Sequence, residues 1–256
     1  MKLSDVRAIV TGAASGMGRH FALALAEAGA SVVAADINEE GLAEVAAAST
    51  DLPGSVVGRT ADVSDEDQVK GLIRSAAEAM GGLNVLVNNA GLFRDSLLVS
   101  VDRETGKVKR TMSLADWNKV IAVDLTGPFL CAREFAAHCI DAGSKPAVIV
   151  NISSVARHGN PGQSNYSAAK AGLVADTKLW GQELARYGIR TGAIAPGFVQ
   201  TPILDGMRPE VLAGMLKAVP LRRAGTCAEI FAGVRFIIEC DYFTSRCIDI
   251  DGGISM

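Results

Sequence analysis

Short apolar runs separated by stretches of helical pattern set the strongest limit on the fold of this chain. Each run is a few residues long and is rich in Val, Ile, Leu and Ala. The runs lie at 6–10, 31–35, 55–58, 83–88, 147–152, 191–195 and 247–251. Strands that alternate with helices form βαβ units, and strands that are apolar on both faces are buried between helices. The pattern predicts an α/β fold: a three-layer, Rossmann-type, doubly wound parallel sheet of about seven strands.

The chain is expected to form one domain, residues 1–256. Its 49% hydrophobic content suffices for one large core, and no linker or repeat interrupts the pattern. The stretch 97–113 departs from the alternation, because it is charged at its centre and Thr105-Gly106 is suited to closing a small hairpin. Two readings stay open: a solvated surface excursion, or a border of a substrate mouth or subunit contact.

Charge and cysteine content restrict the partners. The 28 acidic and 25 basic residues are scattered, which argues against nucleic-acid or anionic-membrane binding. The 5 cysteines form no C-x-x-C pair, so we expect reduced thiols and a cytoplasmic location. We find no signal-peptide pattern and no run of the roughly 18 apolar residues that a membrane span needs. The 3 histidines are far apart, so no metal site is expected. A small molecule is the expected partner.

A glycine-rich turn follows the first predicted strand. Gly12, Gly16 and Gly18 in "TGAASGMG" precede an apolar helical stretch. Glycines there let the backbone approach a phosphate, and the helix N-terminus attracts a pyrophosphate. The spacing G-x-x-x-G-x-G differs from the general G-x-G-x-x-G fingerprint, and tight turns use glycine in any case. The turn alone leaves nucleotide binding and ordinary turn chemistry equally open.

Asp36 at the end of the second predicted strand favours NAD over NADP. A carboxylate about twenty residues after the glycines accepts both hydroxyls of a ribose and repels a 2′-phosphate. Neither the glycine turn nor Ile37, which follows Asp36, supplies a basic side chain. Alternatively, Asp36 stabilises the N-terminus of the helix that starts near Asn38.

Two later strands also end in small or polar residues, at the sheet edge where doubly wound folds bind ligands. Asp62 and Val63 follow the third run, and Asn89, Ala90 and Gly91 follow the fourth. Adjacent asparagines also occur in ordinary turns. Beside the glycine turn and Asp36, we interpret these residues as cofactor contacts.

Tyr166 and Lys170 are four residues apart in "SNYSAAKAG" and share one face if this stretch is helical. The pKa of a free tyrosine is about 10, too high for a base near neutrality, and a fixed cation lowers it. Ser153 and Ser154 end the fifth predicted strand and lie near the same crevice. Taken alone, such a spacing is more commonly an ordinary pair on a helix surface.

These motifs together resemble the short-chain dehydrogenase/reductase family over essentially the whole chain. The matching stretches are "TGAASGMG", "NNAG", Ser-Tyr-x-x-x-Lys and "PGFVQTP". Similarity is greater to the branch with 3-oxoacyl-carrier-protein reductases, acetoacetyl-CoA reductases and 3-hydroxyacyl-CoA dehydrogenases, in "GLFRDSLL", "GQSNYSAAKAGL", "IAPGFVQTPI" and "DIDGGISM". The resemblance implies hydride transfer between a nicotinamide cofactor and a secondary alcohol or ketone.

The resemblance also implies roles for the catalytic residues. Tyr166 would be the general acid/base, and Lys170 would lower its pKa and bind the nicotinamide ribose. Ser154 would hold the substrate oxygen, with Ser153 as the alternative. Asp124 stands where most relatives carry an asparagine that supports a water chain to the lysine, so its role here is open.

The implied NAD pocket consists of Gly12, Ser15, Gly16, Met17, Gly18, Asp36, Ile37, Asp62, Val63, Asn89, Ala90, Gly91, Tyr166, Lys170, Pro196, Gly197, Val199 and Thr201. The implied substrate pocket consists of Leu92, Phe93, Arg94, His158, Asn160, Phe198 and the 200–218 segment. Because the Tyr166 helix stays apolar beyond its active-site face, and because family members pair such helices, we expect a homotetramer.

Two other functions are weighed against an NAD-dependent alcohol dehydrogenase. The first is a 3-oxoacyl-thioester reductase, which Asp36 weakly opposes because such relatives mostly use NADPH. The second is a nucleotide-sensing or scaffold protein that keeps the fold without turnover.

Overall fold

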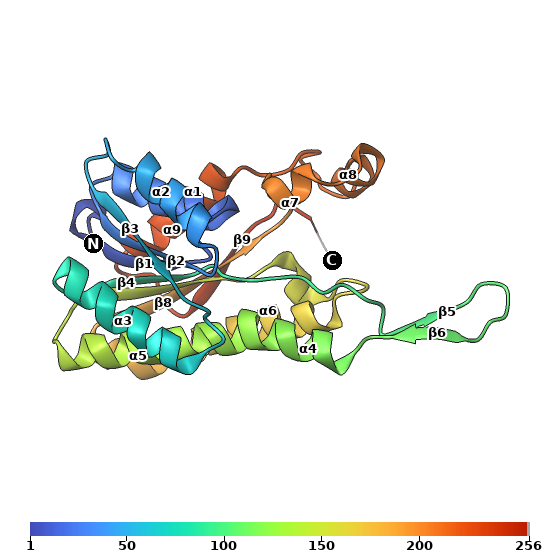
Figure 1. Ribbon diagram of the computed structural model, residues 1–256, viewed down its shortest axis with the longest axis horizontal. Helices are drawn as coiled ribbons and strands as arrows, with labels where there is room; N and C mark the ends of the chain where they lie inside the picture. The colour runs from blue at the N-terminus through green and yellow to red at the C-terminus, as the bar shows by residue number, and fades with distance from the viewer. Residues whose placement is uncertain (255–256) are drawn as a thin grey trace.

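The computed structural model describes residues 1–254 and shows the predicted doubly wound α/β fold (Figure 1). Its parallel sheet has the order β3-β2-β1-β4-β7-β8-β9. The strands are β1 (Arg7–Thr11), β2 (Ser31–Asp36), β3 (Ser55–Thr60), β4 (Val85–Asn88), β7 (Ala147–Ile152), β8 (Ile189–Pro196) and β9 (Arg246–Ile250). The seven predicted strands are confirmed. Ser255 and Met256, which end the "DIDGGISM" motif, lie outside the described residues.

Helices cover both faces of the sheet (Figure 1). One layer holds α1 (Gly16–Glu27), α2 (Glu39–Ala48) and α9 (Cys227–Glu239), and the other holds α3 (Glu66–Met80), α5 (Gly127–Asp141) and α6 (Ser164–Leu184). Successive residues of β2 show why the strands are apolar throughout. Val32 packs into the core under α1 and α9, and Val33 packs into the core under α3 and α5. Both faces of each central strand are therefore buried.

The connections place one crevice at the carboxyl edge of the sheet. After β1 the chain moves outward to β2 and β3, and it then returns to β4 on the other side of β1. Connections that leave in opposite directions from neighbouring strands open a crevice at their carboxyl ends. The short segments η3 (Val155–His158), α7 (Pro202–Asp205) and α8 (Pro209–Leu216) follow β7 and β8 on the same edge.

The 97–113 stretch forms the predicted hairpin. Strands β5 (Val99–Val101) and β6 (Val108–Thr111) pair antiparallel, and Gly106 in the connecting turn has φ +66°. Figure 1 shows this hairpin, here called the arm, projecting away from the body of the molecule.

A helical run follows the arm and contains one irregular turn. It consists of α4 (Leu114–Ile121), the π-helical turn η2 (Ala122–Thr126) and α5. Such single π turns change the direction in which side chains point and are frequent at functional sites. Other short elements are η1 (Leu3–Asp5) and η4 (Ala185–Tyr187). No helix within residues 1–254 is both long and apolar enough to cross a membrane.

Candidate active site

The glycine turn after β1 is closed by contacts that only glycine permits. Gly12 has φ +66°, and a Cβ there would lie 2.7 Å from Cα of Ala90. A Cβ on Gly18 would overlap the carbonyl oxygen of Gly12. The turn thus lies directly against the end of β4 and leads into the N-terminus of α1. Ser15 is the N-cap residue of α1, and its hydroxyl makes no capping hydrogen bond, so it is available to a ligand.

Asn89 ties this turn to β4. Its Nδ2 donates to the carbonyl oxygens of Thr11 at 3.0 Å and Gly12 at 3.1 Å. The Thr11 hydroxyl in turn accepts from the backbone N–H groups of Asn89 and Ala90, each at 3.1 Å. Oδ1 of Asn89 is buried and has no partner within the chain. Thr11 was not among the predicted site residues, although it is the first residue of the matching turn motif.

Asp36 is fixed beside the same turn. Its Oδ2 accepts from the backbone N–H of Ala14 and its Oδ1 from that of Asn38, both at 3.0 Å. Asn38, rather than Asp36, caps α2 by accepting from the N–H of Gly41 at 3.1 Å. The Asp36 carboxylate thus lies both beside the glycine turn and at the N-terminus of α2, and the two roles expected of it remain predictions. Ile37 is 71% exposed.

The remaining predicted cofactor residues lie along the same carboxyl edge. Asp62 accepts hydrogen bonds from the hydroxyl of Ser64 at 2.6 Å and from the N–H of Ser64 at 2.8 Å. The pKa of Asp62 is lowered, and the hydroxyl contact is the largest cause. Thr201 is the N-cap residue of α7 and makes no side-chain cap. The structure brings together Gly12, Ser15, Gly16, Met17 and Gly18 after β1, Asp36 and Ile37 after β2, Asp62 and Val63 after β3, Asn89, Ala90 and Gly91 after β4, and Pro196, Gly197, Val199 and Thr201 at the end of β8.

Tyr166 and Lys170 lie on α6 and are buried, with 8% and 3% of their surfaces exposed. Nζ of Lys170 donates to the carbonyl oxygen of Ile152 at 3.0 Å and lies 5.4 Å from the centre of the Tyr166 ring. The other neighbour of that ring is Phe93, at 4.7 Å between ring centres. A solvated pair on a helix surface is therefore excluded.

The two serines at the end of β7 have different surroundings. The Ser153 hydroxyl is buried and donates to the carbonyl oxygen of Lys170 at 2.9 Å, which holds α6 against β7. Ser154 is partly exposed, its hydroxyl accepts from the N–H of Ala156 at 3.1 Å, and the same hydroxyl lowers the pKa of the nearby Tyr166 phenol. Of the two, Ser154 has the hydroxyl beside the phenol.

Asp124 lies in the π turn and contacts Lys170 directly. Its Oδ1 accepts from the N–H of Leu92 at 2.9 Å, and its Oδ2 is 3.3 Å from Nζ of Lys170. The carboxylate is fully buried. A Cβ at residue 91 would be 2.7 Å from that Oδ2, so Gly91 is needed for this approach. A direct ion pair thus takes the place of the water-linked contact expected from the resemblance.

Burial and charge act in opposite directions on the three groups. Burial raises the pKa of Asp124, although the Lys170 ammonium partly offsets this. Burial alone would lower the pKa of Lys170, but the charges of Asp124 and the phenolate outweigh it and the pKa is raised. Burial raises the pKa of Tyr166, Lys170 lowers it, Asp124 raises it again, and the Ser154 hydroxyl lowers it. Asp124 therefore cancels part of the field that Lys170 exerts on the phenol.

Polar residues that sequence reasoning missed hold the N-terminus of α6. Asn165 is fully buried. Its Nδ2 donates to the carbonyl oxygens of Arg94 at 3.1 Å and Asp116 at 3.3 Å. Gln163 donates to both carboxylate oxygens of Asp95 at 3.1 Å. The only sequence signal was their place directly before Tyr166 in the matching segment "GQSNYSAAKAGL".

The predicted substrate residues lie in different surroundings. Leu92 and Phe93 follow β4 and neighbour Tyr166. Phe198 packs with Val155 and other apolar residues. His158 ends η3 and is exposed. Arg94 is also exposed, Asn160 is partly exposed, and the 200–218 segment contains α7 and α8.

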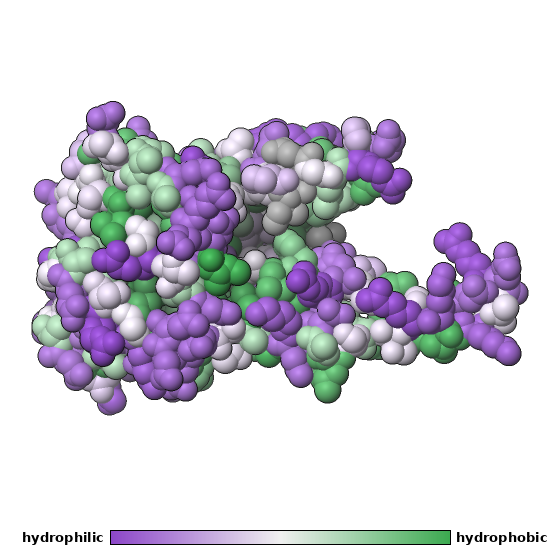
Figure 2. All heavy atoms as spheres, viewed as in Figure 1, coloured by the Kyte–Doolittle hydropathy of each residue, from purple (hydrophilic) through white to green (hydrophobic). Residues whose placement is uncertain are grey.

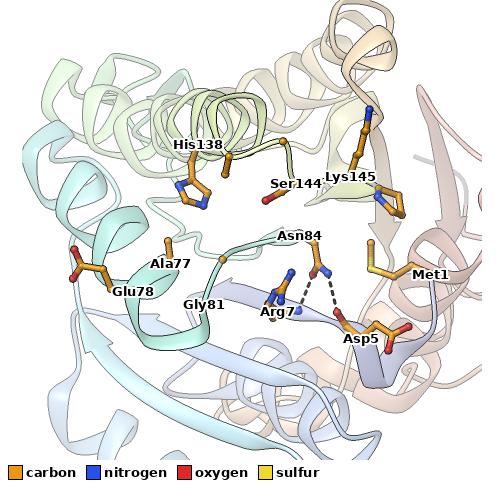
Figure 3. A pocket seen from close by; sticks show the side chains of 14 residues that line it. Met1, Asp5, Arg7, Ala77, Glu78, Gly81, Asn84, His138, Ser144 and Lys145 are labelled. Carbon is orange, nitrogen blue, oxygen red and sulfur yellow. Dashed lines mark hydrogen bonds between the residues drawn. The ribbon is translucent and has the colours of Figure 1, made fainter.

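A separate cavity of about 790 Å³ lies at the opposite, amino edge of the sheet (Figure 3). Arg7, at the start of β1, and Asn84, just before β4, line it together with His138 and Lys145. It is not part of the site around Tyr166.

In the described part of the chain, no three His, Cys, Asp or Glu side chains are grouped so that they would hold a metal ion.

Comparison with known proteins gives consistent matches over the whole chain. The family described as enoyl-(acyl carrier protein) reductase matches residues 12–255. A 3-oxoacyl-[acyl-carrier-protein] reductase of Thermotoga maritima is 38% identical, with 99% of both chains covered. The (2S)-[(R)-hydroxy(phenyl)methyl]succinyl-CoA dehydrogenase subunit BbsD of Thauera aromatica is 35% identical over 100% of this chain and 99% of that one. A solved structure from Sinorhizobium meliloti 1021 has a TM-score of 0.87 at 34% identity, covering 97% of this chain and 96% of that chain.

The geometry predicts that Asp124→Asn lowers the pKa of the Tyr166 phenol, because the substitution removes a negative charge near it while keeping an oxygen for the N–H of Leu92. The measurement is an ultraviolet titration of tyrosinate formation. Subtracting the same titration of Tyr166→Phe isolates Tyr166 from the other two tyrosines.

Asp67→Asn is the matched control, because the Asp67 side chain is 96% exposed on α3. Its titration should coincide with that of the wild type. An unchanged or raised pKa of Tyr166 in Asp124→Asn would contradict the electrostatic coupling.

Proposed function

Because this chain belongs to the short-chain dehydrogenase/reductase family, we propose that it is an NAD-dependent oxidoreductase that interconverts a secondary alcohol and a ketone by hydride transfer. One observation carries the proposal: a buried phenol, Tyr166, with a buried ammonium and a hydroxyl beside it, lies at the sheet edge that also holds the glycine turn and Asp36. Fixed proton donors and charges of this kind are what carbonyl reduction requires.

The residues at the glycine turn fit a dinucleotide. Gly12 lets the turn lie directly against Ala90, the hydroxyl of Ser15 at the N-terminus of α1 makes no capping hydrogen bond, and Oδ1 of Asn89 is buried without a partner in the chain. Gly12, Ser15 and Met17 would hold the pyrophosphate, and Asp36 would accept the adenosine ribose hydroxyls. The nicotinamide would supply or receive the hydride.

The side chains around Tyr166 divide the remaining work. In the reducing direction, the Tyr166 phenol gives its proton to the substrate oxygen while the Ser154 hydroxyl donates a hydrogen bond to the same oxygen. Lys170 stabilises the phenolate that remains, and its ammonium is held in place by Ile152 and Asp124. In the oxidising direction, the phenolate takes the alcohol proton. Asp124 acts through Lys170 and is a positioning residue.

We favour 3-hydroxyacyl and 3-oxoacyl thioesters as the substrate class. The names of two full-length relatives, a 3-oxoacyl-[acyl-carrier-protein] reductase and a [hydroxy(phenyl)methyl]succinyl-CoA dehydrogenase subunit, both refer to acyl thioesters. Phe93 is 40% exposed and offers an apolar surface beside the phenol. A simple secondary alcohol is the second candidate. The Ser154 hydroxyl and the Tyr166 phenol act on the oxygen of an alcohol or ketone and need no thioester group for this.

A scaffold or nucleotide sensor is the less favoured function. Burial of an ammonium and a carboxylate costs several kcal/mol per ion before their attraction offsets it. Holding α6 in place needs no phenol beside the buried Lys170 and Asp124, whereas proton transfer to a substrate does.

The substrate proposal predicts that 3-hydroxybutyryl-CoA is oxidised with a kcat/KM roughly 100-fold or more above that of butan-2-ol, because remote thioester contacts orient the reacting carbon. The measurement is NADH formation at saturating NAD, with R and S forms of both alcohols. Equal kcat/KM values for the thioester and the simple alcohol would favour a simple secondary alcohol as the substrate. No turnover of either would favour a nucleotide sensor.

The cofactor proposal predicts that wild-type protein binds NADH at least about tenfold more tightly than NADPH, because Asp36 repels a 2′-phosphate. Asp36→Ala combined with Ile37→Arg should reduce or reverse this preference. Isothermal titration with both cofactors is the measurement. Glu40→Ala, an exposed carboxylate nearby on α2, is the control and should retain the preference. Equal wild-type affinities would refute the assignment.

The acid/base role predicts that Tyr166→Phe keeps NADH affinity but loses about 10²–10⁴-fold in kcat, because the ring remains and the transferable proton does not. Tyr187→Phe, at a tyrosine that is 38% exposed, serves as the control and should turn over normally. Near wild-type turnover in Tyr166→Phe would contradict the acid/base role and leave Tyr166 with a packing role only.

A further inference from the structure

The arm exposes an unusual amount of apolar surface for a short hairpin. Its exposed apolar side chains, with the exposed fraction of each residue, are Leu97 (53%), Leu98 (68%), Val99 (49%), Val101 (56%) and Val108 (64%). Leu114, at the start of α4 where the arm rejoins the body, is 72% exposed. Single exposed apolar residues are normal, but monomeric proteins rarely expose contiguous apolar patches larger than a few hundred Å².

The strand register gathers the valines on one face of the arm. Val101 is paired with Val108, and Val99 with Thr111, and directly opposed residues share a face. Ser100 is paired with Arg110, so these two lie on the other face. The paired residues on one face, Val99, Val101, Val108 and Thr111, therefore carry no charge, and Arg110 lies on the other face; Lys109 falls at the register shift and is outside this pairing.

The described part of the chain leaves this apolar face uncovered. The arm projects from the body, and β5 and β6 pack mainly on each other (Figure 1). A two-stranded hairpin is at best marginally stable in water, and it becomes stable when a third strand or another surface packs on it. The arm extends roughly 20 Å beyond its base, at about 3.4 Å per residue, so it is long enough to reach onto the surface of a neighbouring subunit.

The helical layer next to the arm also has exposed hydrophobic surface. Figure 2 shows hydrophobic surface along the lower side of the arm and again below the start of α4. The layer of α4, α5 and α6 lies on that same lower side (Figure 1). On this layer Phe129 of α5 is 43% exposed and Leu179 of α6 is 49% exposed. One apolar partner surface could cover the arm and these helices together.

The charge pattern points to a second copy of this chain as the partner. An acidic protein or an anionic membrane would need cations on the contacting face, but among the paired residues of the arm the cation, Arg110, lies on the opposite face and approaches Asp116 of its own chain at 4.0 Å. A symmetric contact between identical subunits brings a patch against the same or a neighbouring patch, which favours uncharged surfaces. The valine face meets that condition.

We propose that the apolar face of the arm packs on a second copy of this chain and is an assembly element. This inference does not rest on the proposed reaction. It gives the expected oligomer a specific contact, and of the two readings of the 97–113 stretch it selects the subunit contact over the solvated excursion.

The base of the arm is connected to the site. The N–H of Ser96 donates to the carbonyl oxygen of Gly162 at 2.8 Å, and Asp95 accepts from Gln163. Both partners precede Tyr166 by only a few residues. A neighbouring subunit that holds the arm would therefore also support the loop from which the Tyr166 helix starts.

The test places the photoreactive amino acid p-benzoyl-phenylalanine at Val101 in the purified full-length protein. Illumination should give an adduct of twice the chain mass, and mass spectrometry should identify both halves as this chain. Arg110 is the matched control position, because it lies on the polar face of the same hairpin and its side chain is 64% exposed. The adduct from residue 110 should be several-fold weaker.

A second measurement is sedimentation of Val101→Glu/Val108→Glu at micromolar concentration, where the variant should form smaller species than the wild type. Arg103→Glu at the arm tip should sediment as the wild type does. Circular dichroism verifies that each variant folds. The body is expected to fold in all of them, because β5 and β6 pack mainly on each other and not on the body. A monomeric wild type, adducts only within one chain, or equal adducts from both positions would overturn the proposal.

Discussion

A buried ammonium determines much of the arrangement at the carboxyl edge of this sheet. Lys170 is almost fully enclosed, so its nitrogen needs acceptors from the protein itself. The carbonyl oxygen of Ile152 at the end of β7 accepts a hydrogen bond from it, and Asp124 in the π turn forms an ion pair with it. Removing one partner of such a buried pair typically costs about 3–5 kcal/mol, because the other charge is left uncompensated. The register of α6 on β7 and the path of the chain between α4 and α5 are therefore fixed by the same charge.

The sequence predicted the architecture well because that information is local. Apolar runs identify buried strands wherever they lie, and Thr105-Gly106 identifies the hairpin from the turn chemistry of two residues. The spacing of Tyr166 and Lys170 predicts a shared helix face without knowledge of the rest of the fold. The glycine turn and Asp36 were likewise interpretable from their places after two strands.

Contacts between distant segments were beyond the reach of such patterns. The choice between Ser153 and Ser154 depends on how α6 packs on β7, because that packing gives Ser153 a backbone acceptor. The direct contact of Asp124 with Lys170 depends on a π turn and on Gly91, and neither leaves a periodic signal. Asn165 joins two segments that are 49 and 71 residues away. In each case the deciding partner lies on another element.

The two hydrogen bonds that Asp36 accepts have a consequence for binding. Both of its oxygens are held by backbone N–H groups before any ligand arrives. The rotational freedom of this side chain is thus given up when the chain folds and does not have to be given up again on association. Each oxygen keeps further lone-pair capacity for a hydroxyl. In the proposed cofactor role, a carboxylate ordered in this way would be a preorganised recognition group, and its selectivity would come without a loss of side-chain entropy at the moment of binding.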